Sequence, residues 1–287
     1  MENWPKVHRR PGANTKQIEY WNGPAGERWS KAQDRIDHHL GLITEALLAV
    51  AAPREGERVL DIGCGGGTTA LILRERVGPD GAVAGIDISG PNLALARARA
   101  HAGMADVTFL DADAATYEFE PAFDLAFSRF GVMFFDDPPA AFANFRTALL
   151  KDGRLVFVCW RTFKENDWSF EPYEAALDLL PPQEPMDPHA PGPFAFADDA
   201  RVRSILDAAG FRDIAVKPLD TTVNMGATLD EALTEALTIG PLARAAAELD
   251  EARREKIRAR IRPVIARHQT SYGIVAPAAV WLVTARN

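Results

Sequence analysis

The 287-residue chain is 47% hydrophobic and 25% charged, with a formal net charge of -8. This length and composition can bury a full core in one or two domains. The acidic balance argues against sequence-independent nucleic-acid binding, which needs a basic face. No apolar run reaches membrane-spanning length, and Cys64 and Cys159 form neither a secreted disulfide framework nor a metal cluster. We therefore expect a cytoplasmic enzyme without a metal, a nucleic-acid partner or membrane insertion.

The N-terminal region predicts a loose polar tail followed by helical structure. Residues 1–15 are polar, and apolar residues at helical spacing predict one amphipathic helix over residues 31–51. Between them, three large aromatic residues surround Gly23-Pro24 and Gly26. They either anchor the tail to the core or form a lid over a ligand; they are Tyr20, Trp21 and Trp29.

The most informative stretch is an apolar run over residues 59–62 that ends in a turn containing Gly63, Gly65, Gly66 and Gly67. The following residues, from Thr68, predict a helix. A buried strand, a glycine turn and a helix form the first half of a nucleotide-binding βαβ unit. Glycine suits a tight turn that a ligand approaches closely, and the helix N-terminus offers unpaired N–H groups to an anion.

The glycines alone do not identify the nucleotide. If the dinucleotide fingerprint G-x-G-x-x-G begins at Gly63, Thr68 stands where its last glycine should be. If it begins at Gly65, Ala70 stands there, and the relaxed form of the fingerprint accepts alanine at that position. Asp61, two residues before the turn, would repel a pyrophosphate and attract an ammonium. A nicotinamide-dependent oxidoreductase remains an alternative, although no tyrosine has a lysine four residues on, as a Tyr-x-x-x-Lys proton donor requires.

Two further predicted strands are followed by acidic residues. The strand over residues 82–88 contains Asp87 near its end, about 20 residues after the glycine turn, where related folds bind ribose hydroxyls. The strand over residues 107–110 is followed by Asp111 and Asp113. These positions favour a nucleoside ligand in either class of enzyme.

The next part of the chain predicts two more strands with a helix between them. Residues 123–127 precede Ser128, Arg129 and Phe130, and residues 154–160 form a fifth apolar strand. In amino-methyltransferases that act on DNA, the motif Asn/Asp-Pro-Pro-aromatic stands at the end of the fourth strand. Asp137-Pro138-Pro139 is similar to it but lies well beyond the end of this strand and is not followed by an aromatic residue. It is more typical of a helix N-cap followed by prolines in the first turn.

The order of these motifs over residues 57–161 resembles the class I S-adenosylmethionine-dependent methyltransferases, most of all the small-molecule branch that includes the quinone C-methylating enzymes. The family's acidic residue followed by G-x-G-x-G is met by Asp61, Gly63, Gly65 and Gly67. The resemblance implies that the loop surrounds the methionine part of the cofactor. It also implies that the acid after the second strand binds ribose, and that Asp113-Ala114 faces adenine, with Asp111 as the rival. The expected cofactor-binding residues are Tyr20, Asp61, Gly63, Cys64, Gly65, Asp87, Ile88, Asp113, Ala114 and Ser128.

Residues at or after the strand ends, together with the N-terminal aromatics, predict an aromatic, apolar substrate pocket. They are Trp21, Trp29, Arg129, Phe130, Met133, Trp160 and Phe163, of which Met133 fits a core position equally well. Methyl transfer from a sulfonium needs positioning and exclusion of water, and it needs a general base only if the nucleophile must lose a proton. The histidine candidates are His38, His39, His101, His189 and His268, and none is assigned.

The implied fold is α/β, a Rossmann-like doubly wound sheet of seven strands with the last strand antiparallel. We expect a tail and helical lid over residues 1–52 and a methyltransferase domain over 53–287, with substrate-side insertions at about 163–197 and 225–272. The implied cofactor is S-adenosylmethionine, its product is S-adenosylhomocysteine, and the acceptor is an O, N or C atom of a small aromatic or apolar molecule. A cofactor-binding module without activity is a second alternative, and a homodimer is left open.

Overall fold

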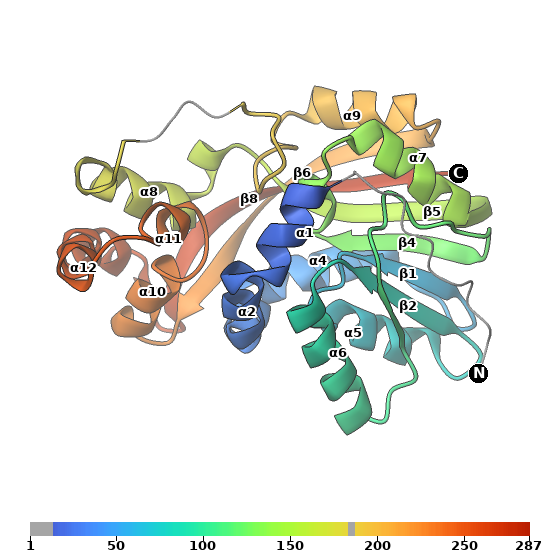
Figure 1. The fold of residues 1–287 in the computed structure, drawn as a ribbon, viewed down its shortest axis with the longest axis horizontal. Coiled ribbons are helices and arrows are strands. Elements are labelled where there is room, and N and C mark those ends of the chain that lie inside the picture. Colours follow the sequence, from blue (N-terminus) through green and yellow to red (C-terminus); the bar gives the residue numbers. More distant parts are fainter. Residues whose placement is uncertain (1–13, 183–186) are drawn as a thin grey trace.

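The computed structural model describes residues 14–182 and 187–287, and one mixed sheet runs through them (Figure 1). The strand order is β3-β2-β1-β4-β5-β8-β6, and the short β7 pairs with β8. Strands β1 to β5 are parallel, whereas β8 is antiparallel to both β5 and β6. The strands are β1 (Arg58–Ile62), β2 (Ala82–Asp87), β3 (Thr108–Asp111), β4 (Phe123–Arg129), β5 (Leu149–Trp160), β6 (Arg212–Gly226), β7 (Gln269–Thr270) and β8 (Gly273–Arg286).

The predicted doubly wound sheet with an antiparallel last strand is confirmed, and β7 is an addition of two residues. The central strands are apolar because helices cover both faces of the sheet. In β1, Val59, Leu60 and Ile62 have no exposed surface. Asp61 is equally buried, and it is the acidic residue in that strand.

Helices cover the sheet and extend beyond its carboxyl edge. Figure 1 shows α7 and α9 together on one side of the sheet, with α5 and α6 on the other. The helices that flank the sheet are α4 (Gly41–Ala51), α5 (Thr68–Val77), α6 (Gly90–Ala102), α7 (Pro138–Ala148) and α9 (Asp199–Ala208). Three N-terminal helices lie across the carboxyl ends of the strands: α1 (Thr15–Asn22), α2 (Pro24–Lys31) and α3 (Gln33–His39).

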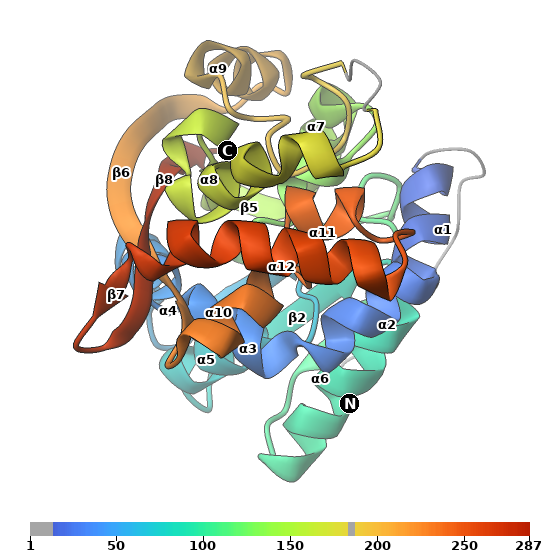
Figure 2. The ribbon, with the colours of Figure 1, turned by 90° about the vertical axis from the view of Figure 1, so that its left-hand side faces the viewer.

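The remaining helices form a second group around the long ends of β6 and β8 (Figures 1 and 2). They are α8 (Asp167–Ala176), α10 (Leu229–Ala236), α11 (Pro241–Ala245) and α12 (Glu251–Ala266), with short 3-10 helices at Val132–Phe134, Phe163–Glu165 and Leu177–Leu179. Helix α8 packs against α12, although the two are far apart in sequence. The segment over residues 225–272 therefore carries α10, α11 and α12 between two paired strands.

The single helix expected over residues 31–51 is wrong, because the chain bends at Leu40 between α3 and α4. Leu40 is buried at the bend, where its backbone leaves helical geometry. The bend lets α4 pack Ile43 and Leu47 against the sheet while α3 lies over the glycine turn. The apolar spacing continues through the bend, so periodicity could not reveal it.

The apolar residues 214–216 and 278–285 predict two short strands, but β6 and β8 are much longer than these segments. Strand β6 lies at the edge of the sheet and alternates irregularly between exposed and partly buried residues. An edge strand with one solvated side lacks the continuous apolar run of a central strand. Residues 181–193 contain six prolines, which predict an extended loop, and their described residues form no helix or strand; residues 183–186 lie outside the described part.

Candidate cofactor and substrate site

The glycine turn connects β1 to α5 in the backbone conformation that its sequence predicts. Gly63, Gly65 and Gly67 have positive φ angles of 68°, 52° and 81°. A Cβ on Gly63 would lie 2.8 Å from the Cα of Gly131, whereas a Cβ on Gly65 would meet no atom within 4 Å. Gly63 is therefore required by packing within the protein. Gly65 borders open space, as expected of a position that a ligand approaches.

Asp61 carries a buried oxygen without a partner. The hydroxyl of Thr69 donates to Asp61 Oδ2 at 2.6 Å, but Oδ1 has no hydrogen-bond partner. Burial raises the pKa of the Asp61 carboxyl to about 7, against the lowering effects of Thr69 and of the positive charge on Arg129. An unpaired buried carboxylate oxygen is costly, and a cationic ligand group would relieve that cost.

Asp87, at the end of β2, holds the glycine turn as well as the strand end. Its Oδ2 accepts from the Gly65 N–H at 2.8 Å, and its Oδ1 accepts from the Ser89 N–H at 2.8 Å. Burial raises its pKa, and these backbone donors oppose the rise. Each carboxylate oxygen has a further lone pair, so the group can still accept from a ligand hydroxyl. The adjacent Ile88 lies at the same edge, and its carbonyl accepts from Asn22.

Asp113 is bound by a residue that the sequence did not reveal. The side-chain amide of Asn14 donates to Asp113 Oδ1 and Oδ2 at 3.0 and 2.9 Å, and Asn14 Oδ1 accepts from the Asp136 N–H at 2.8 Å. The side chain of Asn14 is buried. The partial burial of Asp113 raises the pKa of its carboxyl, and the hydrogen bonds from Ala115 and Asn14 oppose this rise. Ala114 is buried beside it, whereas Asp111 is exposed at the end of β3. The polar tail contains no pattern that singles out Asn14.

Two expected cofactor residues have contacts within the protein. The Ser128 hydroxyl donates to the Ile62 carbonyl at 2.7 Å and accepts from the Gly131 N–H at 3.2 Å. Cys64 is buried, and burial raises the pKa of its thiol well above the ordinary value. Both side chains therefore pack the turn against β4 and β2, and direct contact with a cofactor remains a prediction for each.

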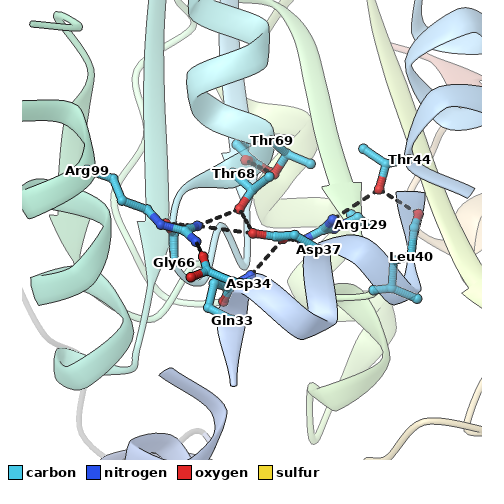
Figure 3. A network of polar contacts seen from close by, with 11 residues as sticks. Gln33, Asp34, Asp37, Leu40, Thr44, Gly66, Thr68, Thr69, Arg99 and Arg129 are labelled. Carbon is cyan, nitrogen blue, oxygen red and sulfur yellow. Dashed lines mark hydrogen bonds and ion pairs between the residues drawn. The ribbon is translucent and has the colours of Figure 1, made fainter. Parts of the chain in front are cut away.

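A polar network fastens α3 to this site (Figure 3). Asp37 Oδ2 accepts from the Thr68 hydroxyl at 2.6 Å and from Arg99 at 3.1 Å. Its Oδ1 accepts from Gln33 at 2.8 Å and from Arg129 at 3.0 Å. Arg129 also donates to the Thr44 hydroxyl at 3.0 Å. Arg129, expected in the substrate pocket, thus joins the end of β4 to the N-terminal helices, and Asp37 is a central residue that sequence reasoning missed.

The expected substrate-pocket residues fall into separate aromatic groups. Trp21 contacts Tyr20, Trp29 and Phe134 with ring centroids 5.3, 5.6 and 5.6 Å apart. Phe163 contacts Phe170, Tyr173 and Phe194 near α8. Met133 is buried within the main core. The structure does not bring these residues into one cluster.

The third group, which we call the aromatic row, consists of Phe130, Trp160 and Trp168. The ring of Phe130 stacks on that of Trp160 with the ring centroids 4.2 Å apart, and the centroids of Trp160 and Trp168 are 5.2 Å apart. Phe130 and Trp160 lie at the ends of β4 and β5, and Trp168 belongs to α8. The row therefore leads from the carboxyl edge of the sheet to the second group of helices.

This geometry defines a class of protein. A doubly wound sheet with a glycine turn after its first strand, and acids after the second and third, is a Rossmann-like nucleotide-binding fold. Residues 59–153 match the family model described as a methyltransferase domain. In the described part of the chain, no helix combines the length and hydrophobicity needed to cross a membrane.

Known proteins narrow this class. Aklanonic acid methyltransferase DauC of Streptomyces sp. (strain C5) is 35% identical over 146 residues, which cover 48% of this chain and 66% of that protein. Nocamycin O-methyltransferase of Saccharothrix syringae is 32% identical over 203 residues, which cover 67% of this chain and 71% of that protein. Demethylmenaquinone methyltransferase of Thermus thermophilus is 39% identical over 108 residues, covering 37% of this chain and 49% of that protein. The chain belongs to the class I S-adenosylmethionine-dependent methyltransferases, as its sequence motifs predicted.

Solved structures show the same fold. Phosphoethanolamine N-methyltransferase 2 of Haemonchus contortus, solved with phosphomonomethylethanolamine and S-adenosylhomocysteine, has a TM-score of 0.53 and 22% identity to this chain. The match covers 85% of this chain and 52% of that one, so this chain spans about half the length of the nematode protein.

Proposed function

We propose that this protein transfers the methyl group of S-adenosylmethionine to an O, N or C atom of a small aromatic or apolar molecule. Two observations carry the proposal in a chain of this family: the open space at Gly65, and the buried, unpaired oxygen of Asp61 two residues before the glycine turn. The matched relatives are named for aklanonic acid, nocamycin and demethylmenaquinone, which supports a small-molecule acceptor. The nicotinamide alternative has no support among these relatives.

The residues at the carboxyl edge of the sheet fit the parts of this cofactor. When bound, S-adenosylmethionine supplies a methyl group already activated by a sulfonium. Asp61 and the Gly63–Gly65 backbone would hold the methionine part, Asp87 the ribose and Asp113-Ala114 the adenine. The protein's own contribution is to orient the two reactants and to exclude water.

The ionisation of Asp61 gives a pH test of this placement. Because its pKa is about 7, the carboxyl is largely protonated at pH 5.5 and must ionise to pair with an ammonium. We expect S-adenosylhomocysteine affinity to rise between pH 5.5 and 7, by roughly tenfold per pH unit at most. This range lies below the pKa of an α-amino group, about 7.7–8.0. Calorimetry should show a clearly shallower pH profile for Asp61→Asn, because only the raised pKa values of Asp87 and Asp113 then remain at the site. A profile as steep as that of the parent would remove Asp61 from the site.

Asp87→Ala is expected to weaken S-adenosylhomocysteine binding by about 1.5–3 kcal/mol, the scale of a hydrogen bond to a charged group. Part of this loss comes from releasing the Gly65 N–H that Asp87 holds. Asp111→Ala is the matched control, because Asp111 occupies the paired position on β3. Calorimetry should show affinity within about threefold of the parent for the control, which is under about 1 kcal/mol. Equal effects of both substitutions would refute the ribose assignment.

We also propose that the N-terminal aromatic segment closes over the cofactor. The Asn22 side chain bonds the Ile88 carbonyl at 2.7 Å and the Gly90 N–H at 2.9 Å, and the Ser89 hydroxyl donates to the Trp21 carbonyl at 2.9 Å. These contacts support α1 and α2 as a lid fastened to the strand end rather than a simple anchor. Water near the sulfonium would weaken the electrostatics of the site, so a cover is chemically useful.

Hydrogen exchange tests the lid. Residues 18–30 should become more protected when S-adenosylhomocysteine is added, while α9, which packs against α7 and β6, should not change. Deleting residues 1–30 should reduce cofactor affinity more than it reduces thermal stability without ligand. Unchanged exchange in residues 18–30, combined with a deletion that costs only stability, would identify the segment as an anchor.

A thermal-shift screen with S-adenosylmethionine, S-adenosylhomocysteine and NAD tests the proposed function as a whole. At a hundredfold excess over Kd, a ligand adds about 2.7 kcal/mol, which raises Tm by about 5–10 °C. We expect this rise with the two adenosyl ligands and none with NAD. A rise with NAD alone would establish the oxidoreductase alternative. Formation of S-adenosylhomocysteine in the presence of an acceptor then distinguishes an enzyme from an inactive binding module.

A further inference from the structure

Two buried titratable side chains meet where the N-terminal helices contact the second helical group. His39 ends α3 and Glu235 lies in α10, and each is 3% exposed. Figure 2 shows the two helices side by side, and His39 Nδ1 lies 3.8 Å from Glu235 Oε1. Among the described residues, no other pair of buried side chains with opposite potential charge joins these two parts of the chain.

The pair is not closed into a hydrogen bond. Neither ring nitrogen of His39 and neither carboxylate oxygen of Glu235 has a hydrogen-bond partner. The Arg35 guanidinium forms an ion pair with Glu235 Oε2 at 3.4 Å, and Arg35 is half exposed. Buried polar groups nearly always have partners, and here Glu235 Oε2 has only its ion pair with Arg35 and the His39 ring has only a weak contact with the backbone of Asn224. This unused hydrogen-bonding capacity points to a further polar group beside the pair.

Burial acts on both members of the pair. It lowers the pKa of His39 to about 4, helped slightly by the charge of His38 and only partly opposed by the backbone of Asn224. It raises the pKa of Glu235 to about 7, although Arg35 lowers it. With these pKa values the imidazole is neutral at neutral pH and the Glu235 carboxylate is the stronger base of the two. A proton that enters through the imidazole is therefore held jointly with the Glu235 carboxylate, whose charge stabilises the imidazolium.

The pair lies at the end of the aromatic row. The His39 ring meets Trp168 edge-on at 4.8 Å, and Trp168 leads through Trp160 to Phe130 at the end of β4. Two residues before His39, Asp37 bonds Thr68 and Arg129 beside the glycine turn. The same short helix therefore fastens the cofactor turn on one face and presents His39 toward the aromatic row on another.

We propose that His39, supported by Glu235, takes the proton from a hydroxyl of a flat aromatic acceptor that lies along Phe130, Trp160 and Trp168. This inference rests on the proposed function and narrows it to O-methylation of a phenolic compound. The imidazole nitrogen Nε2, across the ring from Glu235, accepts the hydroxyl proton. The acceptor oxygen then forms its bond to the methyl carbon as the methyl–sulfur bond breaks, and that electron pair stays on sulfur. The imidazolium next to Glu235 later returns its proton to water.

A merely structural pair would behave differently. Two groups selected only to join helices gain most by bonding each other directly, and His268 shows this with Glu171 at 2.7 Å elsewhere in the chain. His39 and Glu235 are more buried than that pair and yet lie 3.8 Å apart without a hydrogen bond between them. Small-molecule pockets usually combine apolar and aromatic walls with a few polar groups that orient the ligand. Here the rings of the aromatic row would supply the flat apolar contacts, and His39 with Glu235 would supply the polar group.

The test uses two phenols of different size whose colour reports ionisation, 4-nitrophenol and alizarin. Each is added to protein saturated with S-adenosylhomocysteine, at a pH where the phenol in solution is mostly protonated. We expect visible spectra of the bound phenolate for the parent and for His38→Gln, the matched control on the neighbouring, less buried histidine. In His39→Gln and in Glu235→Gln, the ionised fraction of at least one bound phenol should fall about fivefold or more. The reason is that each variant loses the neighbouring base that stabilises the ionised phenol.

The outcomes separate this inference from the function on which it rests. If S-adenosylhomocysteine binds but neither phenol binds, or if the bound phenol stays ionised in both His39→Gln and Glu235→Gln, the inference is overturned and the methyltransferase proposal stands. If S-adenosylhomocysteine does not bind to the parent, both fail. Should His39→Gln lose the fold, shown by loss of S-adenosylhomocysteine binding, the spectrum with Glu235→Gln decides.

Discussion

Gly65→Leu is expected to remove most of the S-adenosylhomocysteine affinity while the protein remains folded. The position has a φ of 52°, which costs a non-glycine residue about 1–2 kcal/mol, but its side chain would enter open space. A leucine there would fill the volume assigned to the cofactor. We expect affinity to fall roughly 100-fold or more, at about 1.4 kcal/mol for each factor of ten. Calorimetry measures the affinity, and thermal unfolding without ligand measures the fold.

Gly63→Ala is the contrasting variant in the same turn. Its Cβ would lie 2.8 Å from backbone at Gly131, with a φ of 68°. Strain and overpacking together predict a loss of about 2–5 kcal/mol in the free energy of unfolding. The two substitutions should therefore have different effects: Gly65→Leu should lower the affinity for the ligand, and Gly63→Ala should lower the free energy of unfolding. A Gly65→Leu protein that binds the ligand as tightly as the parent would place the cofactor elsewhere.

Asp37→Asn is expected to have the largest effect on stability among single changes in the network of Figure 3. The substitution removes the charge that Arg99 and Arg129 share, and Arg129 is only 10% exposed. Breaking a buried ion pair costs about 3–5 kcal/mol, and we expect a value near the lower end of that range because Asp37 is 19% exposed. Urea unfolding without ligand measures this loss.

Asp34→Asn is the matched control, since Asp34 lies on the same helix and also pairs with Arg99. Its side chain is 95% exposed, so solvent screens the pair and the change should have little effect. Hydrogen exchange should also show α3 less protected in Asp37→Asn than in the control. Equal stability of the two variants would mean that the network does not fasten the N-terminal helices to the glycine turn.

Much of the fold was predictable because its signals are local. The glycine turn, the acids after β2 and β3, and the capping Asp137 are each recognised from a few adjacent residues. The family resemblance implied the doubly wound sheet and its antiparallel last strand. The helix bend at Leu40 and the full lengths of β6 and β8 were missed, because apolar spacing neither marks a bend nor shows where an edge strand ends.

The polar contacts between distant segments could not be predicted in the same way. Asn14 meets Asp113 across 99 residues, and Asp37 meets Arg129 across 92. In the sequence, Asp37 is one charge on a helix rich in charge. His39 was one of five unassigned histidines, and only the fold shows that it faces Glu235 beside the aromatic row. Side-chain pairing of this kind depends on the packing of whole elements.

The most direct test of the account is a crystal structure of the protein with S-adenosylhomocysteine. We predict the homocysteine part at Gly63–Gly65 with its ammonium toward Asp61, the ribose at Asp87, and the adenine at Asp113-Ala114. The Asp113 carboxylate would then accept from the adenine amino group as well as, or in place of, the Asn14 amide. A ligand bound elsewhere, with the Gly65 space filled only by water, would contradict the central claim that this edge of the sheet is the cofactor site.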